Sequence, residues 1–263
     1  MRQALVSIVI RTLPGRIELL NRAVRSVVNQ TYDEIEIIIV EDGSNSSQGI
    51  VRNNAASIRY FPIEKSGRCV AGNLGMSQSE GEFVNFLDED DELLPNHVEL
   101  MVNKLTQDRD ISGAYGASFE VYSDISSYSP LIIESHRTKV FGRWPFNLGQ
   151  LWQQNQFPIQ AVMFRKAAYD MFGGLDIHLD ALEDWDLWLR FTAMQDFGFV
   201  DRVTSRYRVP HSIVDRDRRR LEHMRYLSIV RKRQRKLLRE CNDSRARERL
   251  ASAFRASRVT GTP

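Results

Sequence analysis

The chain has 263 residues, of which 42% are hydrophobic and 27% are charged, close to the average for soluble globular domains. This composition excludes a disordered chain, a collagen-like chain and a coiled-coil rod, and the length allows one or two domains. The net charge of +2 conceals an asymmetry, because residues 202–263 carry 19 basic and 6 acidic side chains, whereas residues 1–201 carry 17 and 28. A basic tail on an acidic body predicts an anionic partner for the tail.

Cysteine content and hydropathy indicate in which cellular compartment the protein is expected. Only Cys69 and Cys241 are present, which excludes a disulfide scaffold and suits a reducing compartment. The uncharged stretch 144–164 contains too many glutamines to cross a bilayer, and the first residues lack the features of a cleavable leader. We therefore expect a cytoplasmic protein, soluble or held peripherally at the inner face of the membrane.

The first 100 residues alternate between strand and helix patterns. Apolar, β-branched runs predict strands at 6–10, 35–40, 58–61 and 83–87. Helical spacing of apolar residues predicts helices at 17–28, 69–77 and 95–105. This order is typical of a doubly wound α/β sheet with helices on both faces, in which ligands bind at the carboxyl ends of the strands.

The rest of the chain is less regular. Strands are predicted at 114–122, 131–133 and 160–164. A short helix should end at Gly173-Gly174, and a further helix is predicted at 183–194. Residues 207–212 read as a loop, and two Arg-rich helices are expected from about Asp215 onward.

Two acidic segments follow predicted strands. The four carboxylates from Asp88 to Asp91 would repel one another without a cation among them, which predicts a Mg²⁺ or Mn²⁺ site completed by substrate phosphates. Asp42 follows the most apolar strand, where a carboxylate can accept hydrogen bonds from a nucleobase or a ribose. A solvated acidic turn is the alternative interpretation of both segments.

A third acidic segment, Glu183-Asp184-Trp185-Asp186, opens a predicted helix. These carboxylates either stabilise the start of the helix or include a general base that takes a proton from a hydroxyl. Asp184 and Asp186 are two residues apart and do not share a helix face, so one of them is expected to reach a cleft. Candidates for phosphate or metal contacts, or else ordinary surface and core residues, are Arg68, Asn73, Arg208 and His211.

Several segments occur in an order that resembles glycosyltransferase family 2. They are VSIVIRT, SVVNQTY, IEIIIVEDGS, GNLGMSQSEGEFVNFLDEDDELLP, GGLD and EDWDLWLR. The resemblance covers about residues 4–212 and implies an inverting enzyme with the GT-A fold, a Rossmann-like, doubly wound mixed sheet with flanking helices. It divides the chain into a nucleotide-binding half (1–100), an acceptor half (101–212) and an Arg-rich helical extension (213–263).

The resemblance also implies residue roles in nucleotide binding. Thr12 and Asp42 would contact the nucleobase or ribose, whereas Arg68 and Asn73 would line the nucleotide pocket. The loop after the first strand departs from the family pattern by one extra residue. The usual Asp-Asp-Gly-Ser reads Glu-Asp-Gly-Ser here, with Asp42 retained.

Further roles concern the metal and the chemistry. Asp88 and Asp90 match the DXD motif of the family, with Asp90 as the direct ligand of Mn²⁺ or Mg²⁺ and Asp88 nearer the ribose. Asp184 matches the catalytic base. His211 lies where some relatives have a histidine near the diphosphate, and it is a third candidate metal ligand.

The favoured function is transfer of a sugar from a nucleotide-diphosphate sugar, with UDP as the expected nucleotide, to a saccharide or lipid-linked acceptor in cell-surface polysaccharide or glycolipid assembly. A sugar-phosphate nucleotidylyltransferase should have a Gly- and Arg-rich loop after the first strand, where only Gly15 occurs. A non-enzymatic, basic-tailed module for nucleotide or membrane binding would not explain three acidic segments, and a glycosidase would not need a nucleotide-type sheet. Nucleic acid is not an expected partner, because the acidic body would repel it.

The basic tail leaves three interpretations open. Leu221, Met224, Leu227 and Val230 follow near-helical spacing, which predicts one packed face opposite a basic face. The basic face could dock on an anionic membrane, grip the diphosphate of an acceptor, or simply be solvated.

Overall fold

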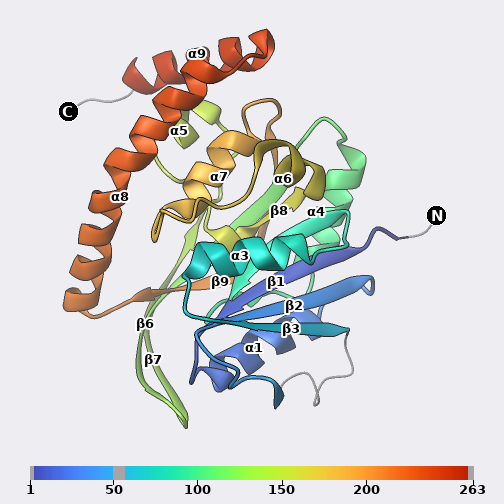
Figure 1. Ribbon diagram of the computed structural model, residues 1–263, viewed down its shortest axis with the longest axis vertical. Coiled ribbons are helices and arrows are strands. Elements are labelled where there is room, and N and C mark those ends of the chain that lie inside the picture. The colour runs from blue at the N-terminus through green and yellow to red at the C-terminus, as the bar shows by residue number, and fades with distance from the viewer. Residues whose placement is uncertain (1–2, 50–56, 260–263) are drawn as a thin grey trace.

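The computed structural model describes residues 3–49 and 57–259, which form a mixed sheet with helices on both faces (Figure 1). The strands are β1 (Val6–Thr12), β2 (Ile35–Asp42), β3 (Ile58–Ile63), β4 (Phe83–Asp88), β5 (Glu92–Leu93), β6 (Gly113–Tyr128), β7 (Leu131–Phe141), β8 (Val162–Arg165) and β9 (Phe197–Pro210). The helices are α1 (Ile17–Val28), α3 (Arg68–Ser77), α4 (His97–Gln107), α5 (Leu148–Gln153), α6 (Lys166–Phe172), α7 (Glu183–Phe191), α8 (Ile213–Glu240) and α9 (Ser244–Val259), with a 3₁₀ turn η1 at Ile159–Ala161.

The sheet has the strand order β3-β2-β1-β4-β8-β6-β9-β5, with β7 paired to β6. Strands β1 to β4 pair in parallel, so that Val9 lies opposite Ile38 on one side and Phe86 on the other. From β8 onward antiparallel pairs enter, because β8 runs against both β4 and β6. The predicted doubly wound mixed sheet is confirmed.

Each central strand is buried on both faces, which explains its continuous apolar run. Ile8 and Ile10 face a core formed with α1 and α4, whereas Val9 faces a second core formed with α3 and α7. Successive residues of a strand point to opposite faces, so alternate residues of β1 contribute to the two cores. Figure 1 shows α3 and α7 on the near face of the sheet and α1 behind it.

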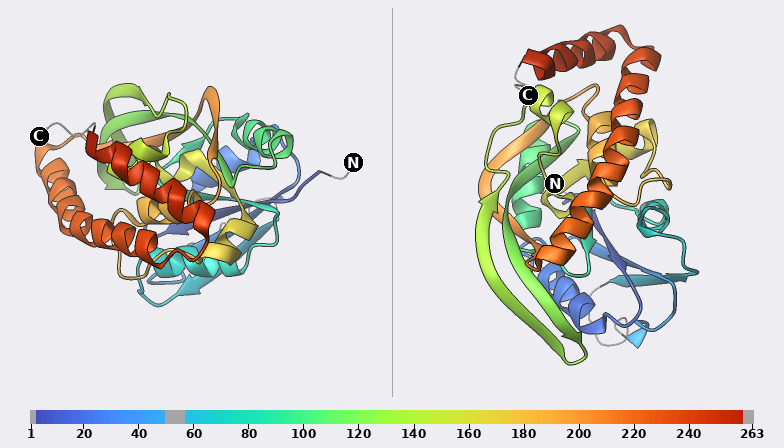
Figure 2. Two further views of the ribbon diagram at one scale, coloured as in Figure 1. Left: turned by 90° about the horizontal axis from the view of Figure 1, so that it is seen from above. Right: turned by 90° about the vertical axis from the view of Figure 1, so that its left-hand side faces the viewer.

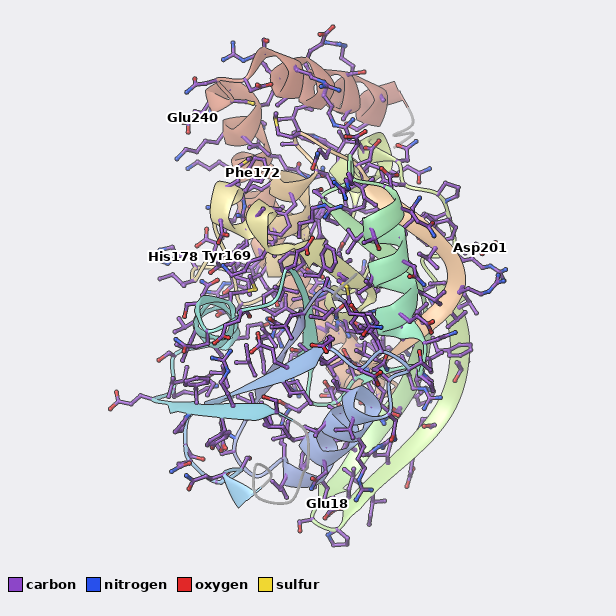
Figure 3. All side chains as sticks on the ribbon, turned by 90° about the vertical axis from the view of Figure 1, so that its right-hand side faces the viewer. Glu18, Tyr169, Phe172, His178, Asp201 and Glu240 are labelled. Carbon is purple, nitrogen blue, oxygen red and sulfur yellow. The ribbon has the colours of Figure 1, made fainter. Side chains whose placement is uncertain are left out.

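A long hairpin, β6–β7, replaces the short strands predicted at 114–122 and 131–133. The strands contain 16 and 11 residues and pair antiparallel with two register shifts. Most of β7 is exposed and polar, so it has no apolar alternation from which its length could be predicted. Near the tip, the backbone N–H of Leu131 donates to Glu18 of α1, which Figure 3 labels at the lower edge of the molecule.

The segment predicted as a loop at 207–212 is a strand over most of its length. Residues 207–210 end β9, which pairs parallel to β6 and places Arg208 opposite Val121. The Pro and the two basic residues suggested a loop, but the strand is imposed by pairing with a distant segment. This correction matters for function, because β9 leads the chain to α8.

The Arg-rich extension does form two helices, and they pack into the body rather than standing apart (Figure 2). Tyr226 and Val230 of α8 and Leu250 of α9 belong to the same core as the β8 and α7 side chains. The predicted packed face is wrong in part, because Leu221 is 66% exposed and Met224 is 59% exposed. None of the helices in the described ranges is both long and apolar enough to cross a bilayer.

Burial of the extension predicts a measurable stability difference within it. Leu250→Ala should lower the free energy of unfolding by about 2–5 kcal/mol, because it leaves a cavity in the core. Leu221→Ala, on the exposed side of α8, should change it by less than about 0.5 kcal/mol. Urea unfolding of both variants tests this, and equal, small effects would show that the extension does not share the core.

Candidate active site

An open cleft of about 1510 Å³ lies at the carboxyl ends of β1 and β4. It is bounded by the acidic segment after β4, the start of α7 and the first half of α8. Its principal carboxylates are Asp88, Asp90, Asp91, Glu183 and Asp184. Its guanidinium groups belong to Arg11, Arg16, Arg68, Arg208, Arg216, Arg218, Arg219, Arg220 and Arg231. A cleft that contains both carboxylates and guanidinium groups, at the carboxyl ends of the strands, suits a ligand that carries phosphate and polar groups.

The carboxylates after β4 differ in their partners. Both oxygens of Asp88 accept hydrogen bonds from Arg11, at 2.7 and 2.9 Å, and Arg11 holds the pKa of Asp88 below its ordinary value despite the opposing effect of burial. Asp91 accepts a hydrogen bond from the backbone N–H of Arg208. The Asp90 carboxylate has no side-chain partner within the described ranges, and burial together with the charge of Asp88 raises its pKa. A cation beside Asp90 would relieve this repulsion.

The chemistry of these donors fits a hard divalent cation. Mg²⁺ and Mn²⁺ are usually held by one or two protein carboxylates and by phosphate oxygens of the substrate. Asp90 offers a carboxylate without another partner, and Asp88 is the second candidate. In the described part of the chain, three or more metal-binding side chains do not converge on one point, so a ligand's phosphates would complete the coordination.

A buried charge network lies beneath the cleft. Arg11 is 4% exposed, and its Nη1 lies 3.3 Å from Glu183 Oε1, while Nη1 of Arg68 lies 3.4 Å from the same oxygen. The order Asp88–Arg11–Glu183–Arg68 therefore joins the ends of β1 and β4 to the starts of α3 and α7. Burying a charged side chain within an apolar strand costs free energy unless the charge is paired. The position of Arg11 inside an apolar strand is therefore the sequence feature that indicates a buried ion pair. The network fixes α7 against the acidic segment.

Asp184, the second residue of α7, lines the cleft. Its Oδ2 accepts a hydrogen bond of 2.7 Å from the Asn155 side chain, and its Oδ1 accepts one from the backbone N–H of Trp185. Burial, followed by the negative charge of Glu183, raises the pKa of Asp184 to about 7. A positioned carboxylate that titrates near neutrality can accept a proton from a hydroxyl. Asn155 was missed from the sequence, because 29 residues separate it from its partner.

Comparison with known proteins identifies the chain. The family model described as "Glycosyl transferase family 2" matches residues 7–172, more than half of the sequence. The chain belongs to glycosyl transferase family 2. An uncharacterized glycosyltransferase of Rickettsia typhi is 28% identical over 210 residues, which are 78% of this chain and 64% of that protein.

A second relative has a named acceptor. The GalNAc(5)-diNAcBac-PP-undecaprenol β-1,3-glucosyltransferase of Campylobacter jejuni is 33% identical over 108 residues, 39% of this chain and 35% of that protein. The chain therefore spans less than two thirds of the length of either curated relative.

Solved structures confirm the GT-A fold. S. aureus TarS 1–349 in complex with UDP-GlcNAc has a TM-score of 0.68 at 15% identity, covering 98% of this chain and 74% of that one. The mannosyltransferase PcManGT from Pyrobaculum calidifontis, in complex with GDP-Man and Mn²⁺, has a TM-score of 0.65 at 14% identity, covering 100% and 77%. At this level of identity the likeness concerns the fold alone.

The two aspartates near the start of α7 face different ways. Asp184 lines the cleft, whereas Asp186 is buried behind it and pairs with Arg190 at 3.0 Å and with Arg233 of α8 at 2.6 Å. The helical geometry therefore brings one of the two into the cleft, as expected. Asp186 instead joins α7 to the extension.

Thr12 and Asp42, which were proposed to contact the nucleobase or ribose, do not line this cleft. Asp42 ends β2, and its oxygens accept hydrogen bonds from Lys65 Nζ at 2.6 Å and from the backbone N–H groups of Ser66 and Gly67. The Lys65 side chain is 64% exposed, so a nucleobase could displace it. Thr12 is buried at the end of β1, and its hydroxyl contacts only a backbone oxygen, at 3.5 Å. Their roles stay predictions.

Arg68 and Asn73 lie on the same helix but have different surroundings. Arg68, the first residue of α3, lines the cleft with a half-exposed guanidinium. Asn73 does not line the cleft, and both its amide atoms bind the backbone of Leu175, at 2.8 Å each, so its role in the nucleotide pocket stays a prediction. One turn and a half of helix turns Asn73 away from Arg68, so it holds the GGLD segment in place instead.

His211 also lies away from the proposed metal position. Its ring stacks on His136 of β7 with 3.8 Å between the ring centroids, and its backbone N–H donates to Asp124. The histidine that lines the cleft is His223 of α8, which sequence analysis did not single out. Arg208 does line the cleft, where its Nε donates to the backbone oxygen of Asp90 at 3.0 Å. It supports the acidic segment.

Proposed function

We propose that this chain is an inverting, metal-dependent glycosyltransferase that moves a sugar from a nucleotide-diphosphate sugar to an acceptor hydroxyl. The observation that carries the proposal is one cleft that contains both Asp90 and Asp184. No side chain in the described part of the molecule pairs with the Asp90 carboxylate, and the pKa of Asp184 is raised. Family membership supports the reaction class. The UDP-GlcNAc and GDP-Man complexes of proteins with this fold support a nucleotide-sugar donor, and we propose UDP as its nucleotide.

In the proposed reaction, ionised Asp184 accepts the proton of the acceptor hydroxyl. The hydroxyl oxygen forms a bond to the anomeric carbon while the bond from that carbon to the diphosphate breaks, and the diphosphate leaves with the electron pair. Attack from the face opposite the leaving group inverts the carbon. A bound Mn²⁺ or Mg²⁺, held by Asp90 with Asp88, would stabilise the negative charge of the diphosphate. Arg68 lies in the cleft to add a second positive charge.

A panel of nucleotides tests this function. Thermal shifts should be recorded with UDP, GDP, CDP and dTDP, each with and without Mn²⁺. A ligand at 100 times its Kd stabilises the folded state by about 2.7 kcal/mol, enough to raise the Tm by several degrees. We expect the largest rise with UDP and Mn²⁺ together. Unchanged Tm values with every nucleotide, even with Mn²⁺, would refute donor binding, and equal shifts without Mn²⁺ would refute the metal dependence.

We propose a saccharide or lipid-linked acceptor, in the assembly of a surface polysaccharide or glycolipid. The name of the Campylobacter jejuni relative, which specifies an undecaprenol-linked acceptor, supports this class. A peripheral contact with an anionic membrane would then present the acceptor. The outward side of α8 suits such a contact, because Val214 and Leu221 are 69% and 66% exposed and the exposed Arg225 lies one turn beyond Leu221.

Vesicle binding tests the membrane contact. The full chain should co-sediment with phosphatidylglycerol vesicles at low salt and be released at high salt, since each engaged basic residue contributes roughly 1 kcal/mol. Val214→Glu/Leu221→Glu should stay in the supernatant, because it places charges on the apolar contact. Truncation before α8 is not a suitable control, since Val230 and Leu250 are core residues. A wild-type chain that stays in the supernatant at low salt would exclude the contact.

A further inference from the structure

One face of α8 changes character along the helix. In its second half, Tyr226, Val230 and Gln234 lie at four-residue steps and are buried against the body. Toward the start of α8, a step of three residues from Tyr226 leads to His223 and a further step of four leads to Arg219, and both of these residues line the cleft. The face that packs on the core in the second half therefore lines the cleft in the first half. Figure 2 shows the course of α8 along the body.

The arginines on this overhanging face differ from those elsewhere on α8. Arg216, Arg219 and Arg220 line the cleft, and their guanidinium groups have no ion-pair or hydrogen-bond partner within the described ranges. By contrast, Arg233 pairs with Asp186, and Arg231 donates to the backbone oxygens of residues 152 and 153. The first half of α8 thus presents to the cleft three guanidinium groups that have no partner in the described part of the chain, and a guanidinium can bind a phosphate through two hydrogen bonds.

Apolar side chains lie beside these charges. Met224 and Leu227 line the same part of the cleft and are 59% and 38% exposed. A purely saccharide ligand would not require them, and the donor diphosphate already has Arg68 and the metal proposed at the acidic segment. Exposed apolar groups next to unpaired arginines complement a ligand whose phosphate is attached to a hydrocarbon chain.

We propose that the first half of α8 is the acceptor-binding wall, and that the acceptor is a saccharide attached through a diphosphate to a hydrocarbon chain. Arg216, Arg219 and Arg220 bind the diphosphate, and Met224 and Leu227 contact the start of the chain. The proposal rests on the glycosyltransferase function above, because it assigns the acceptor of that reaction. It separates the cleft side of α8 from the outward side, to which the membrane contact was assigned.

The Kd of farnesyl diphosphate, measured in EDTA, tests the acceptor-binding wall. EDTA removes divalent metal, so that the metal-dependent donor site does not bind diphosphate. The wild type should bind farnesyl diphosphate at least about tenfold more tightly than inorganic diphosphate, since the chain adds apolar burial. Arg216→Gln/Arg219→Gln/Arg220→Gln should weaken farnesyl diphosphate by about tenfold or more, through lost charge-assisted hydrogen bonds. Met224→Gln/Leu227→Gln should weaken farnesyl diphosphate and leave inorganic diphosphate unchanged.

A matched control removes three charges from the exposed side of the same helix, as Arg225→Gln/Lys232→Gln/Arg239→Gln. It should bind farnesyl diphosphate within about twofold of the wild type, because distant surface charges contribute little. All variants should retain the wild-type affinity for UDP with Mn²⁺. Equal losses in the two triple variants would show a general charge effect and overturn the proposal.

Two further outcomes would also overturn it. A wild type that binds UDP with Mn²⁺ but not farnesyl diphosphate would retain the proposed function and lose the acceptor wall. If Arg216→Gln/Arg219→Gln/Arg220→Gln weakens UDP and not farnesyl diphosphate, the arginines belong to the donor site. Failure of UDP to bind the wild type counts against the proposed function itself, and the farnesyl diphosphate measurement is independent of it.

Discussion

Replacing Asp184 by asparagine should leave the donor bound and slow sugar transfer by about 10²–10⁴-fold, the usual contribution of a general base. Asparagine has the same shape and can still accept the hydrogen bond from Trp185, but it cannot take up the proton of the acceptor hydroxyl. Single-turnover transfer rates and the donor Kd, measured separately, distinguish the two effects. A parallel loss of donor affinity would mean that Asp184 acts in binding.

Asp186→Asn is the matched control for this variant. It lies two residues away on the same helix and is buried against Arg190 and Arg233 rather than in the cleft. Its loss should therefore appear as a lower free energy of unfolding, because Arg190 and Arg233 each lose one ion pair. If Asp186→Asn slows transfer more than Asp184→Asn in protein that is still folded, the proton acceptor is assigned to the wrong carboxylate.

The pH dependence gives an independent check on Asp184. The base works only when it is ionised, so the transfer rate should rise with pH through the pKa of about 7 that burial and Glu183 give this group. Asn155→Ala removes a hydrogen bond to the ionised carboxylate and should move this rise to higher pH. A rate that is constant between about pH 5.5 and 8 would exclude Asp184 as the base.

Asp90→Ala should remove the part of nucleotide binding that depends on Mn²⁺ and lower the transfer rate by about 10³-fold, since a bound metal contributes several kcal/mol to stabilising the leaving group. The fold should persist, because no side chain in the described ranges pairs with the Asp90 carboxylate and its loss leaves no buried charge alone. Calorimetric titration of UDP with and without Mn²⁺, beside urea unfolding, measures both quantities.

Two neighbouring carboxylates serve as comparisons. Asp88→Asn should cost about 3 kcal/mol or more in the free energy of unfolding, because it leaves the buried Arg11 without its bidentate partner. Asp170→Asn, on the exposed surface of α6, should change neither binding nor stability. If Asp90→Ala binds UDP with an unchanged dependence on Mn²⁺, Asp90 is not the metal ligand.

The first half of the sheet could be predicted because its strands are buried on both faces. A run such as Ile35–Val40 is typical of a strand buried on both faces of a parallel sheet, and the acidic residues that follow it must then lie at the ligand-binding edge. The placement of Asp90 and Asp184 in one cleft follows from the same topology. Local patterns were sufficient wherever burial was uniform.

The sequence did not predict the structure correctly where contacts between distant segments determine it. The hairpin strand β7 is polar because one side of it faces solvent, and it is held by its pairing with β6. In α8, Leu221 and Met224 are three residues apart and Tyr226 and Val230 are four apart. Both spacings fit a helix, so the pattern contains two possible packed faces. The contact between Gln234 and the backbone of Trp152 chooses between them, and neither residue is marked as a partner in the sequence.

The anchoring of α8 has a consequence for how substrates enter. Its second half is fixed by core packing and by Arg233, so its first half projects as the continuation of a rigid rod rather than as a loop that closes on the ligand. An acceptor that meets a preorganised wall does not bear the entropic cost of ordering a lid. Within 216–227, the residues that line the cleft differ from those that pack in the core. Substitutions of the cleft-lining residues can therefore change acceptor preference while the fold is preserved. Relatives could therefore diverge in acceptor choice through a few turns of one helix.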